Sequence, residues 1–220
     1  MTALVIAIDG PAAAGKGTLA RRLADALRLP YLDTGLLYRA VGRRVLDACG
    51  DPADPAQAQA AAESLVPEDM RRTDLRGPQA DAAASAVAVI PAVRAALLAF
   101  QRGFAQDGGA VLDGRDIGTV IFPDAPAKLF VTATLPERAR RRWLELQARG
   151  VAVTLAGVEA EMQARDAQDA ARAVAPLRPA PDAVVLDTTA LDADAAFAAA
   201  LEAVHAKLCP ASSPDPFASV

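Results

Sequence analysis

The stretch Ala3-Leu-Val-Ile-Ala-Ile-Asp9-Gly10-Pro-Ala-Ala-Ala-Gly15-Lys16-Gly17-Thr18 decides the fold of this chain. A run of aliphatic residues, typical of a buried strand, leads into a loop bounded by two glycines and then into a helical pattern. Gly10 and Gly15 lack a β-carbon, so the loop can take positive φ angles and bring its amide groups close to an anion. Amides at the positive end of the following helix can surround a phosphate, and Lys16 adds a positive charge. The pattern therefore predicts a phosphate-binding loop for a nucleotide.

One position of this loop departs from the commonest form. Gly17 stands where serine or threonine is usual, and the hydroxyl that can serve Mg²⁺, directly or through water, comes at Thr18. The Lys-Gly-Thr ending resembles the loop of nucleoside monophosphate kinases of the adenylate kinase type. The predicted ATP-binding residues form one continuous segment: Gly10, Pro11, Ala12, Ala13, Ala14, Gly15, Lys16, Gly17 and Thr18. The alternative is a glycine-rich turn with a surface lysine.

Composition limits the remaining possibilities. The 220 residues, 53% of them hydrophobic, suffice for one domain with a core that needs no disulfide or structural metal. The net charge of −4 argues against a nucleic-acid-binding surface. Cys49 and Cys209 match no metal spacing, which is typical of buried or idle thiols in a reducing compartment, and the lone His205 lies far from the loop. No apolar run of membrane-spanning length and no signal peptide is recognised, so we expect a cytoplasmic protein.

Apolar segments alternate with helical patterns along the chain. The expected strands are 4–9, 30–33, 110–113, 128–133 and 183–187, and the expected helices are 15–29, 36–49, 90–106, 136–149 and 193–208. This alternation predicts an α/β fold, a five-stranded parallel sheet flanked by helices, with ligands at the carboxyl ends of the strands. We expect a single domain over residues 1–208 and a disordered tail over residues 209–220.

A second segment with chemical character is Asp33-Thr34-Gly35-Leu36-Leu37-Tyr38-Arg39. It combines a strand end, a glycine turn and a helix start, which makes Thr34 a candidate N-cap. Arg39 lies further along the same helix and could hold a phosphate with two parallel hydrogen bonds. A helix cap followed by a solvated arginine is the alternative.

A third segment, Asp113-Gly114-Arg115-Asp116, ends the third expected strand. An acid at a strand end near a phosphate loop is placed to hold Mg²⁺ or its water, so Asp113 is a candidate metal residue. The alternative is an ordinary charged turn.

A fourth segment is the arginine-bearing helix that contains Arg165, Asp169 and Arg172. The spacing predicts an i, i+4 pair between Arg165 and Asp169, with Arg172 on the same face. The segment is either an exposed helix with ion pairs or a lid that carries arginines onto a transferring phosphoryl group. In the preceding helix the same spacing predicts pairs from Arg141 to Glu137 and to Glu145.

Together these segments resemble the cytidylate kinases of the bacterial type, over nearly the whole chain. The motifs that carry the resemblance, as they stand here, are Ile8-Asp9-Gly10-Pro11, Gly15-Lys16-Gly17-Thr18, Leu32-Asp33-Thr34-Gly35 with Tyr38-Arg39, Ala84-Ser85-Ala86-Val87-Ala88, Pro91-Ala92-Val93-Arg94, the stretches 113–120 and 122–126, and the stretch 165–177.

The resemblance implies transfer of the γ-phosphoryl group of ATP to CMP or dCMP, with Mg²⁺ as cofactor, by a protein that is usually a monomer. It places a CMP-binding segment at about 34–106 and a lid at about 150–175. The implied CMP-binding residues are Thr34, Tyr38, Arg39, Ser85, Arg94, Arg115, Asp116, Asp169 and Arg172. The implied catalytic residues are Lys16, Arg115, Arg165 and Arg172, and the implied metal residues are Thr18 and Asp113.

Within this set, Asp116, Arg94 and Ser85 fall on the family's base pocket, and their types suit cytosine. A carboxylate faces the N4 amino donor, and arginine and serine donors face the N3 and O2 acceptors. The stretch between Tyr38 and Ser85 is shorter than in the long enterobacterial form, and its residues 65–74 look too short and too polar for the β-rich insert found there. Two alternatives remain: a kinase of the same fold for UMP, AMP or a non-nucleotide acceptor, and a nucleotide-binding module without catalysis.

Overall fold

The structure, a computed structural model, describes residues 4–106 and 108–209. Its centre is a parallel sheet in which the strands lie in the order β2-β3-β1-β4-β5. The strands are β1 Val5–Asp9, β2 Tyr31–Asp33, β3 Ala110–Gly114, β4 Ala127–Thr132 and β5 Val184–Asp187. The predicted α/β fold with a five-stranded parallel sheet is confirmed, and each predicted strand end lies within one residue of the observed end.

The helices divide into those that were predicted and those that were not. The predicted ones, with ends at most two residues from those expected, are α1 Lys16–Leu27, α2 Thr34–Asp47, α5 Pro91–Phe104, α6 Leu135–Ala148 and α8 Ala193–Leu208. The arginine-bearing helix is α7 Leu155–Ala170. Four helical segments were not expected: α3 Pro55–Glu63, the 3₁₀ segment η1 Pro67–Arg71, α4 Pro78–Ala88 and the π-helical turn η2 Ile117–Ile121.

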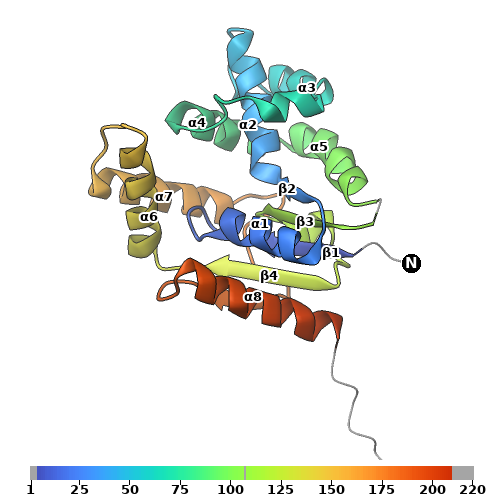
Figure 1. The fold of residues 1–220 in the computed structure, drawn as a ribbon. Coiled ribbons are helices and arrows are strands. Elements are labelled where there is room, and N and C mark those ends of the chain that lie inside the picture. The colour runs from blue at the N-terminus through green and yellow to red at the C-terminus, as the bar shows by residue number, and fades with distance from the viewer. Residues whose placement is uncertain (1–3, 107, 210–220) are drawn as a thin grey trace, which may run out of the picture.

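The two faces of the sheet bury different side chains, because successive residues of a strand point to opposite sides. In β1, Val5 and Ala7 join a core with α2, α3 and α5, whereas Ile6 and Ile8 pack with α1 and α8. In Figure 1, α2 to α5 lie above the strands, α1 lies in front of them and α8 lies below β4. The predicted cover of helices on both faces is therefore present.

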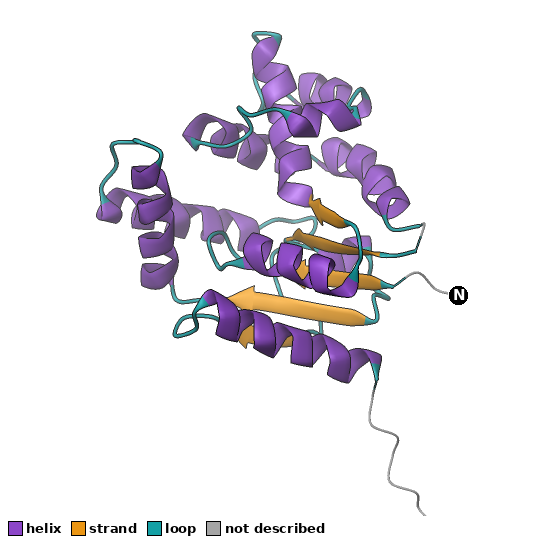
Figure 2. Ribbon diagram, in the orientation of Figure 1, coloured by secondary structure: helices purple, strands orange, loops and turns teal. Residues whose placement is uncertain are grey.

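A third, smaller core joins α6 to α7. Leu146 of α6 packs with Val158 and Met162 of α7, and the indole of Trp143 donates a hydrogen bond of 3.2 Å to the carbonyl oxygen of Val153 in the loop between them. This pair of helices stands beside the sheet, to the left of α2 to α5 in the view of Figures 1 and 2. The strands occupy only the lower half of the molecule in that view.

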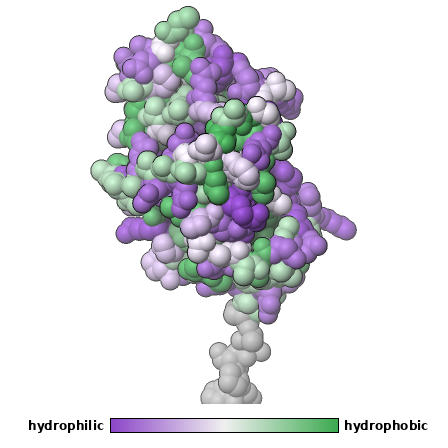
Figure 3. Space-filling view, turned by 90° about the vertical axis from the view of Figure 1, so that its left-hand side faces the viewer, coloured by the Kyte–Doolittle hydropathy of each residue, from purple (hydrophilic) through white to green (hydrophobic). Residues whose placement is uncertain are grey.

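The outer surface mixes polar and apolar side chains, as the face in Figure 3 shows. Among the described helices none has by itself the length and apolar composition to cross a membrane. The pair α4 and α5 meets that test only when joined, and it is bent by 100° at the break. Cys49 and Cys209 are both exposed free thiols. The expected tail at 209–220 lies, from residue 210 onward, outside the described residues.

Candidate active site

The phosphate-binding loop joins β1 to α1 and depends on two glycines with positive φ. A β-carbon on Gly10, whose φ is +148°, would lie 1.9 Å from the carbonyl oxygen of Val131, so this approach of two backbones requires glycine. Gly15, with φ +89°, is the N-cap of α1 and has no side chain to occupy the first amides of the helix. Lys16 is buried, and its Nζ donates a hydrogen bond of 2.8 Å to the carbonyl oxygen of Pro11. The loop therefore has the backbone form expected for binding a phosphate.

The main cleft, of about 380 Å³, opens beside this loop at the carboxyl ends of β1, β2 and β3. It brings together residues that were selected from six separate segments of the sequence. These are Ala12, Ala13, Gly15, Lys16, Gly17, Thr18, Thr34, Tyr38, Arg39, Ser85, Arg94, Asp113, Arg115, Asp116, Arg165, Asp169 and Arg172. Of the selected loop residues, Gly10, Pro11 and Ala14 do not line it.

At one end of the main cleft, Asp116 and Arg94 form a buried ion pair. The Nη2 group of Arg94 donates to Oδ2 of Asp116, and both side chains are less than a tenth exposed. The guanidinium of Arg94 also lies 5.6 Å from the centre of the Tyr38 ring. Ser85 donates through its hydroxyl to the carbonyl oxygen of Asp81, one turn earlier in α4. This end of the cleft offers one carboxylate beside hydrogen-bond donors.

Thr34 does not cap α2 as predicted. Asp33 is the N-cap residue, and Thr34 is already the first residue of the helix. Its hydroxyl donates a hydrogen bond of 2.7 Å to the carbonyl oxygen of Asp113 instead. The prediction was wrong because no loop separates β2 from α2, so the hydroxyl meets the end of the neighbouring strand β3.

Asp113, near the end of β3, lies close to Gly17 in the first turn of α1. Its Oδ1 accepts a hydrogen bond of 3.1 Å from the Tyr31 hydroxyl, and its Oδ2 lies 3.6 Å from the point that a β-carbon of Gly17 would occupy. Burial, and then the charge of Asp33, raises the pKa of Asp113 above its ordinary value. Burial, and then the charge of Arg115, lowers the pKa of Lys16. Both shifts would be relieved by ligands that bring opposite charge to these groups.

Arg165 of α7 and Arg172, just beyond that helix, also line the main cleft, and each has an unused hydrogen-bond donor. Asp169, which is 2% exposed, accepts hydrogen bonds from Nε of Arg115 at 2.9 Å and from Nη2 of Arg172. The buried Nε atoms of Arg165 and Arg172 have no hydrogen-bond partner among the described residues. Burial, and then the charge of Arg115, lowers the pKa of Arg165 to about 10. Buried donors of this kind indicate an anionic ligand.

Of the three ion pairs predicted by helical spacing, one is present and two are not. Arg165 does not pair with Asp169, because Arg115 and Arg172 occupy both oxygens of that carboxylate. Arg141 pairs with Glu137 as predicted. Glu145 pairs with Arg142 and Arg149 instead of Arg141. Arg141 also donates hydrogen bonds to the hydroxyl and the carbonyl oxygen of Thr188.

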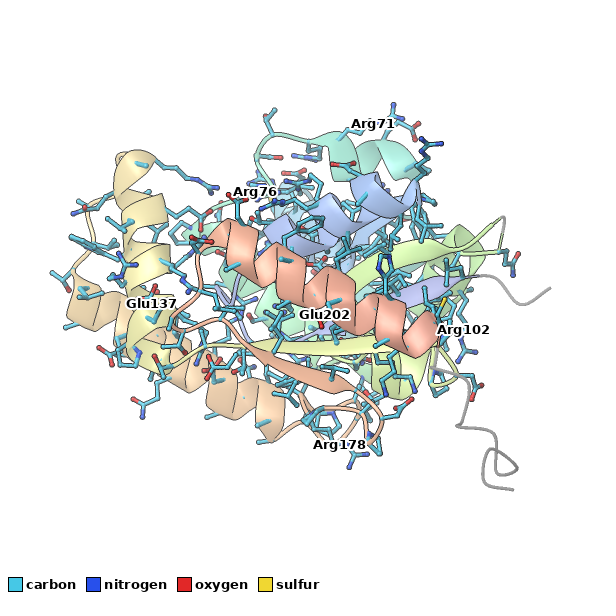
Figure 4. All side chains as sticks on the ribbon, turned by 60° about the horizontal axis from the view of Figure 1, so that its bottom comes forward. Arg71, Arg76, Arg102, Glu137, Arg178 and Glu202 are labelled. Atoms are coloured by element: carbon cyan, nitrogen blue, oxygen red, sulfur yellow. The ribbon has the colours of Figure 1, made fainter. Side chains whose placement is uncertain are left out.

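Asp81, which sequence reasoning missed, joins two walls of the main cleft. Its Oδ1 accepts from Nε of Arg39 at 2.9 Å, and its Oδ2 accepts from Nη2 of Arg142 on α6. The only feature of the sequence that could have indicated a role for Asp81 is its position four residues before Ser85, one turn earlier on α4. Arg76, labelled in Figure 4, also lines this cleft from the loop before α4. Asp81 thus links the helical segment α2–α4 to the pair α6 and α7.

We expect Asp81→Asn to loosen this link without unfolding the protein. The pair of Asp81 with Arg142 is partly buried, so its loss should speed amide hydrogen exchange in α6 and α7 about fivefold, equivalent to roughly 1 kcal/mol. Asp74→Asn is the matched control, because Asp74 pairs with Arg43 and Arg72 away from α6. Equal exchange in α6 and α7 of both variants would contradict the link.

A second cleft, of about 340 Å³, lies on the other side of the phosphate loop and was not predicted. Ala14, Gly15 and Thr18 form one wall. The opposite wall comes from the start of α6, including Glu137 (Figure 4) and Arg140, and from residues 188–196 at the start of α8. The loop therefore separates two cavities, one on each side of the predicted phosphate position.

Comparisons with known proteins agree over nearly the whole chain. The sequence model of the family described as cytidylate kinase matches residues 6–206. A cytidylate kinase from Granulibacter bethesdensis is 69% identical over 93% of this chain and 98% of its own length. Another, from Acidiphilium cryptum, is 63% identical over 92% of this chain and 95% of its own.

A solved structure shows the same fold. The crystal structure of an uncharacterized protein from Eubacterium ventriosum matches 92% of this chain and 98% of its own with a TM-score of 0.52. At 16% sequence identity this likeness concerns the fold alone.

Proposed function

The chain belongs to the cytidylate kinase family, and we propose that its two clefts hold ATP and a cytidine monophosphate for direct phosphoryl transfer. It is an enzyme of the kinase class, and its reaction is the phosphorylation of CMP; dCMP is proposed as a second acceptor. The observation that carries the assignment is the main cleft, with a phosphate loop, unpartnered arginine donors and a carboxylate–arginine pair along one cavity. The alternatives of another acceptor or of a non-catalytic module are not favoured.

The donor nucleotide is assigned to the phosphate loop and the second cleft. Backbone amides of the loop Gly10–Thr18, other than that of Pro11, and the ammonium of Lys16 would hold the β- and γ-phosphates of ATP. The second cleft adjoins the same loop at Ala14 and Thr18, so it can take the nucleoside part of ATP. This arrangement leaves the main cleft free for the acceptor.

A magnesium ion fits the residues beside the loop. Thr18 and Asp113 line the main cleft, and they supply the oxygen ligands that Mg²⁺ prefers. The residues that the structure describes contain no cluster of three acidic, histidine or cysteine side chains that could hold a metal. We therefore propose that phosphate oxygens and water complete the coordination, and the ion would neutralise charge on the triphosphate.

The acceptor base is assigned to Asp116, Arg94 and Ser85. The carboxylate of Asp116 can accept from the N4 amino group of cytosine, and Arg94 and Ser85 can donate to its N3 and O2 atoms. Uracil would turn a carbonyl oxygen toward Asp116, and two acceptors would then face each other in a buried site. Sites built on hydrogen bonds reject such mismatches strongly.

The acceptor phosphate and sugar are assigned to the other arginines of the main cleft and to Asp169. Arg39, Arg115 and Arg172 would hold the 5′-phosphate, and Asp169 with Arg165 would contact the sugar. Tyr38 and Thr34 line the wall next to them. The unpartnered Nε donors of Arg165 and Arg172 support this assignment, because a sugar hydroxyl and a phosphate oxygen could accept hydrogen bonds from them.

The proposed reaction is an in-line displacement at the γ-phosphorus. An oxygen of the CMP phosphate forms a bond to that phosphorus while the bond to the β,γ-bridging oxygen breaks, and ADP leaves. The attacking oxygen already carries negative charge, so no general base is needed. Catalysis then rests on positioning and on charge neutralisation by Lys16, Arg115, Arg165 and Arg172. Closure of the lid at about 150–175 would exclude water and prevent hydrolysis of ATP.

A panel of acceptors tests this assignment. ADP release, coupled to NADH oxidation, would be measured with CMP, dCMP, UMP and AMP at equal concentrations. We expect CMP and dCMP to be favoured over UMP and AMP by at least about 100-fold in kcat/KM. Equal turnover of UMP would contradict the base assignment, and nucleotide binding without ADP release would indicate a module that has lost catalysis.

The organisation of the chain remains part of the proposal. We propose one kinase domain over residues 1–208, with the CMP-binding segment and the lid as its mobile parts, acting as a monomer in the cytoplasm without nucleic-acid or membrane partners. Light scattering of the purified protein with and without nucleotides would test the monomer.

A further inference from the structure

Asp9 is a buried carboxylate that the mechanism above does not use. It is the last residue of β1, directly before Gly10, and only 4% of it is exposed. Its Oδ1 accepts a hydrogen bond from the amide of Ile117, and its Oδ2 accepts one from the amide of Gly118, each at 2.8 Å. These two amides follow Asp116 directly in the chain. Asp9 therefore holds the backbone immediately after the residue assigned to the base.

The two hydrogen bonds meet a need of the π-helical turn η2. The first amides of any helical turn have no partner inside it, and a side chain usually caps them. Asp116 is the N-cap of η2 but makes no hydrogen bond to these amides, because its carboxylate is turned toward Arg94. Asp9 caps the turn from a neighbouring strand instead. As a result, the carboxylate of Asp116 stays available to the main cleft.

Among the described residues, Asp9 has no ion-pair partner. Burial, helped by the charge of Asp116, raises the pKa of Asp9 to about 6, against the opposing effect of the two amides and of the charge of Lys16. The stem of Lys128 passes close by, but its ammonium pairs with Asp182 and the carbonyl oxygen of Pro123. A buried carboxylate that forms no ion pair among the described residues costs stability, so its hydrogen bonds to η2 are its evident use.

We propose that Asp9 is a positioning residue for base selection: it fixes the turn that aims the Asp116 carboxylate at the amino group of the bound base. The inference rests on the proposed function, in which Asp116 reads cytosine. It also makes β1 the common support of both nucleotides, because Asp9 continues directly into the phosphate loop at Gly10.

The first test is Asp9→Asn, which keeps the size of the side chain but leaves it one acceptor and one donor group. One of the two amides then faces a donor, and the turn should shift. We expect the ratio of kcat/KM for CMP to that for UMP to fall about 10- to 100-fold, since a small misplacement of a positioned group has effects of this size. The two acceptors share their ribose and phosphate, so a general loss of folding or of ATP binding cancels in the ratio.

Gly118→Ala tests the same contact from the other side without altering a charged residue. The added β-carbon would lie 3.2 Å from Cδ of Lys128 and 3.4 Å from Oδ2 of Asp9, so it should push η2 away from its cap. The matched control is Gly103→Ala in α5, where an added β-carbon meets nothing within 4 Å. We expect the selectivity ratio to fall in Gly118→Ala and to stay unchanged in Gly103→Ala.

The outcomes separate the inference from the function on which it rests. If the unaltered enzyme shows no preference for CMP over UMP, the proposed function is wrong and the inference fails with it. If the unaltered enzyme prefers CMP and both Asp9→Asn and Gly118→Ala keep the full ratio, only the role of Asp9 is overturned. A reduced ratio in both variants, with an unchanged Gly103→Ala, supports it even when the melting temperatures differ.

Discussion

Lys16→Met should lower kcat for CMP phosphorylation by about 10³-fold while the protein remains folded. The Lys16 ammonium lies at the start of α1, beside the loop that is assigned to the triphosphate, and methionine keeps the length of the stem without the charge. Loss of one preorganised charge at a transferring phosphoryl group removes stabilisation that is present mainly in the transition state. The measurement is steady-state ADP release with saturating ATP and CMP. Lys207→Met, the same exchange at the far end of α8, should leave kcat unchanged.

The same substitution should not lower the melting temperature, and this separates loss of chemistry from loss of fold. Burial, and then the charge of Arg115, lowers the pKa of Lys16 below its ordinary value of 10.5, so the charged form is less favourable in the folded than in the unfolded protein. The unfolded state then binds more protons, and stability rises with pH between the lowered value and 10.5. At neutral pH, methionine removes this cost. A variant of Lys16 with near-normal turnover would contradict the phosphate-loop assignment.

The phosphate loop and the sheet could be predicted from the sequence because their signals are local. The strand at Val5–Asp9, the two glycines and Lys16 follow one another within a dozen residues, and each requirement acts through the backbone of that short segment. The parallel sheet follows from strands separated by helices. The unexpected helices α3 and α4 consist largely of alanine, so their apolar pattern was too weak to mark them.

Side-chain partners in the site were harder to predict, because they come from distant segments. The spacing of Arg165 and Asp169 allows an ion pair on the helix, but Arg115, which lies 54 residues before Asp169, takes the carboxylate. A local pair contributes only a few tenths of a kcal/mol on a helix surface. Asp169 is instead buried, in the last turn of α7, where pairing matters more. The sequence therefore predicted which charged residues belong to the site, but not which of them form ion pairs with one another.

The second cleft could not be predicted from the sequence for the same reason, because its walls come from segments that lie far apart in the chain. Its walls come from Ala14–Leu19, from residues 137–141 and from residues 188–196, and none of these segments carries a motif for a nucleoside. Asp81 was missed for a related reason: its role as a bridge depends on Arg142 of α6, and sequence gives no indication that α4 and α6 meet. Such features follow from the packing of the helices around the sheet.

Asp116→Asn should remove most of the preference for CMP over UMP, and it is the second large effect that we expect. The substitution replaces an acceptor facing the cytosine amino group by a side chain that can also donate, so kcat/KM for CMP should fall by about 10³-fold and that for UMP much less. Asparagine is chosen because alanine would leave the guanidinium of Arg94 buried without its partner, at a cost of about 3–5 kcal/mol. The amide oxygen of asparagine can still accept from Arg94, so the fold should persist.

The experiment compares kcat/KM for CMP, dCMP and UMP in the unaltered enzyme, in Asp116→Asn and in Asp124→Asn. Asp124 is exposed and lies just beyond the same turn, so it provides the same chemical change outside the cleft. The KM for ATP should remain unchanged in both variants, because the donor is assigned to the phosphate loop and the second cleft. If Asp116→Asn keeps the CMP preference of the unaltered enzyme, the base must be read by other groups. Cytosine recognition would then have to be assigned to other residues. The proposed reason for rejecting UMP, namely that the buried Asp116 carboxylate lacks a hydrogen-bond donor when uracil is bound, would no longer hold.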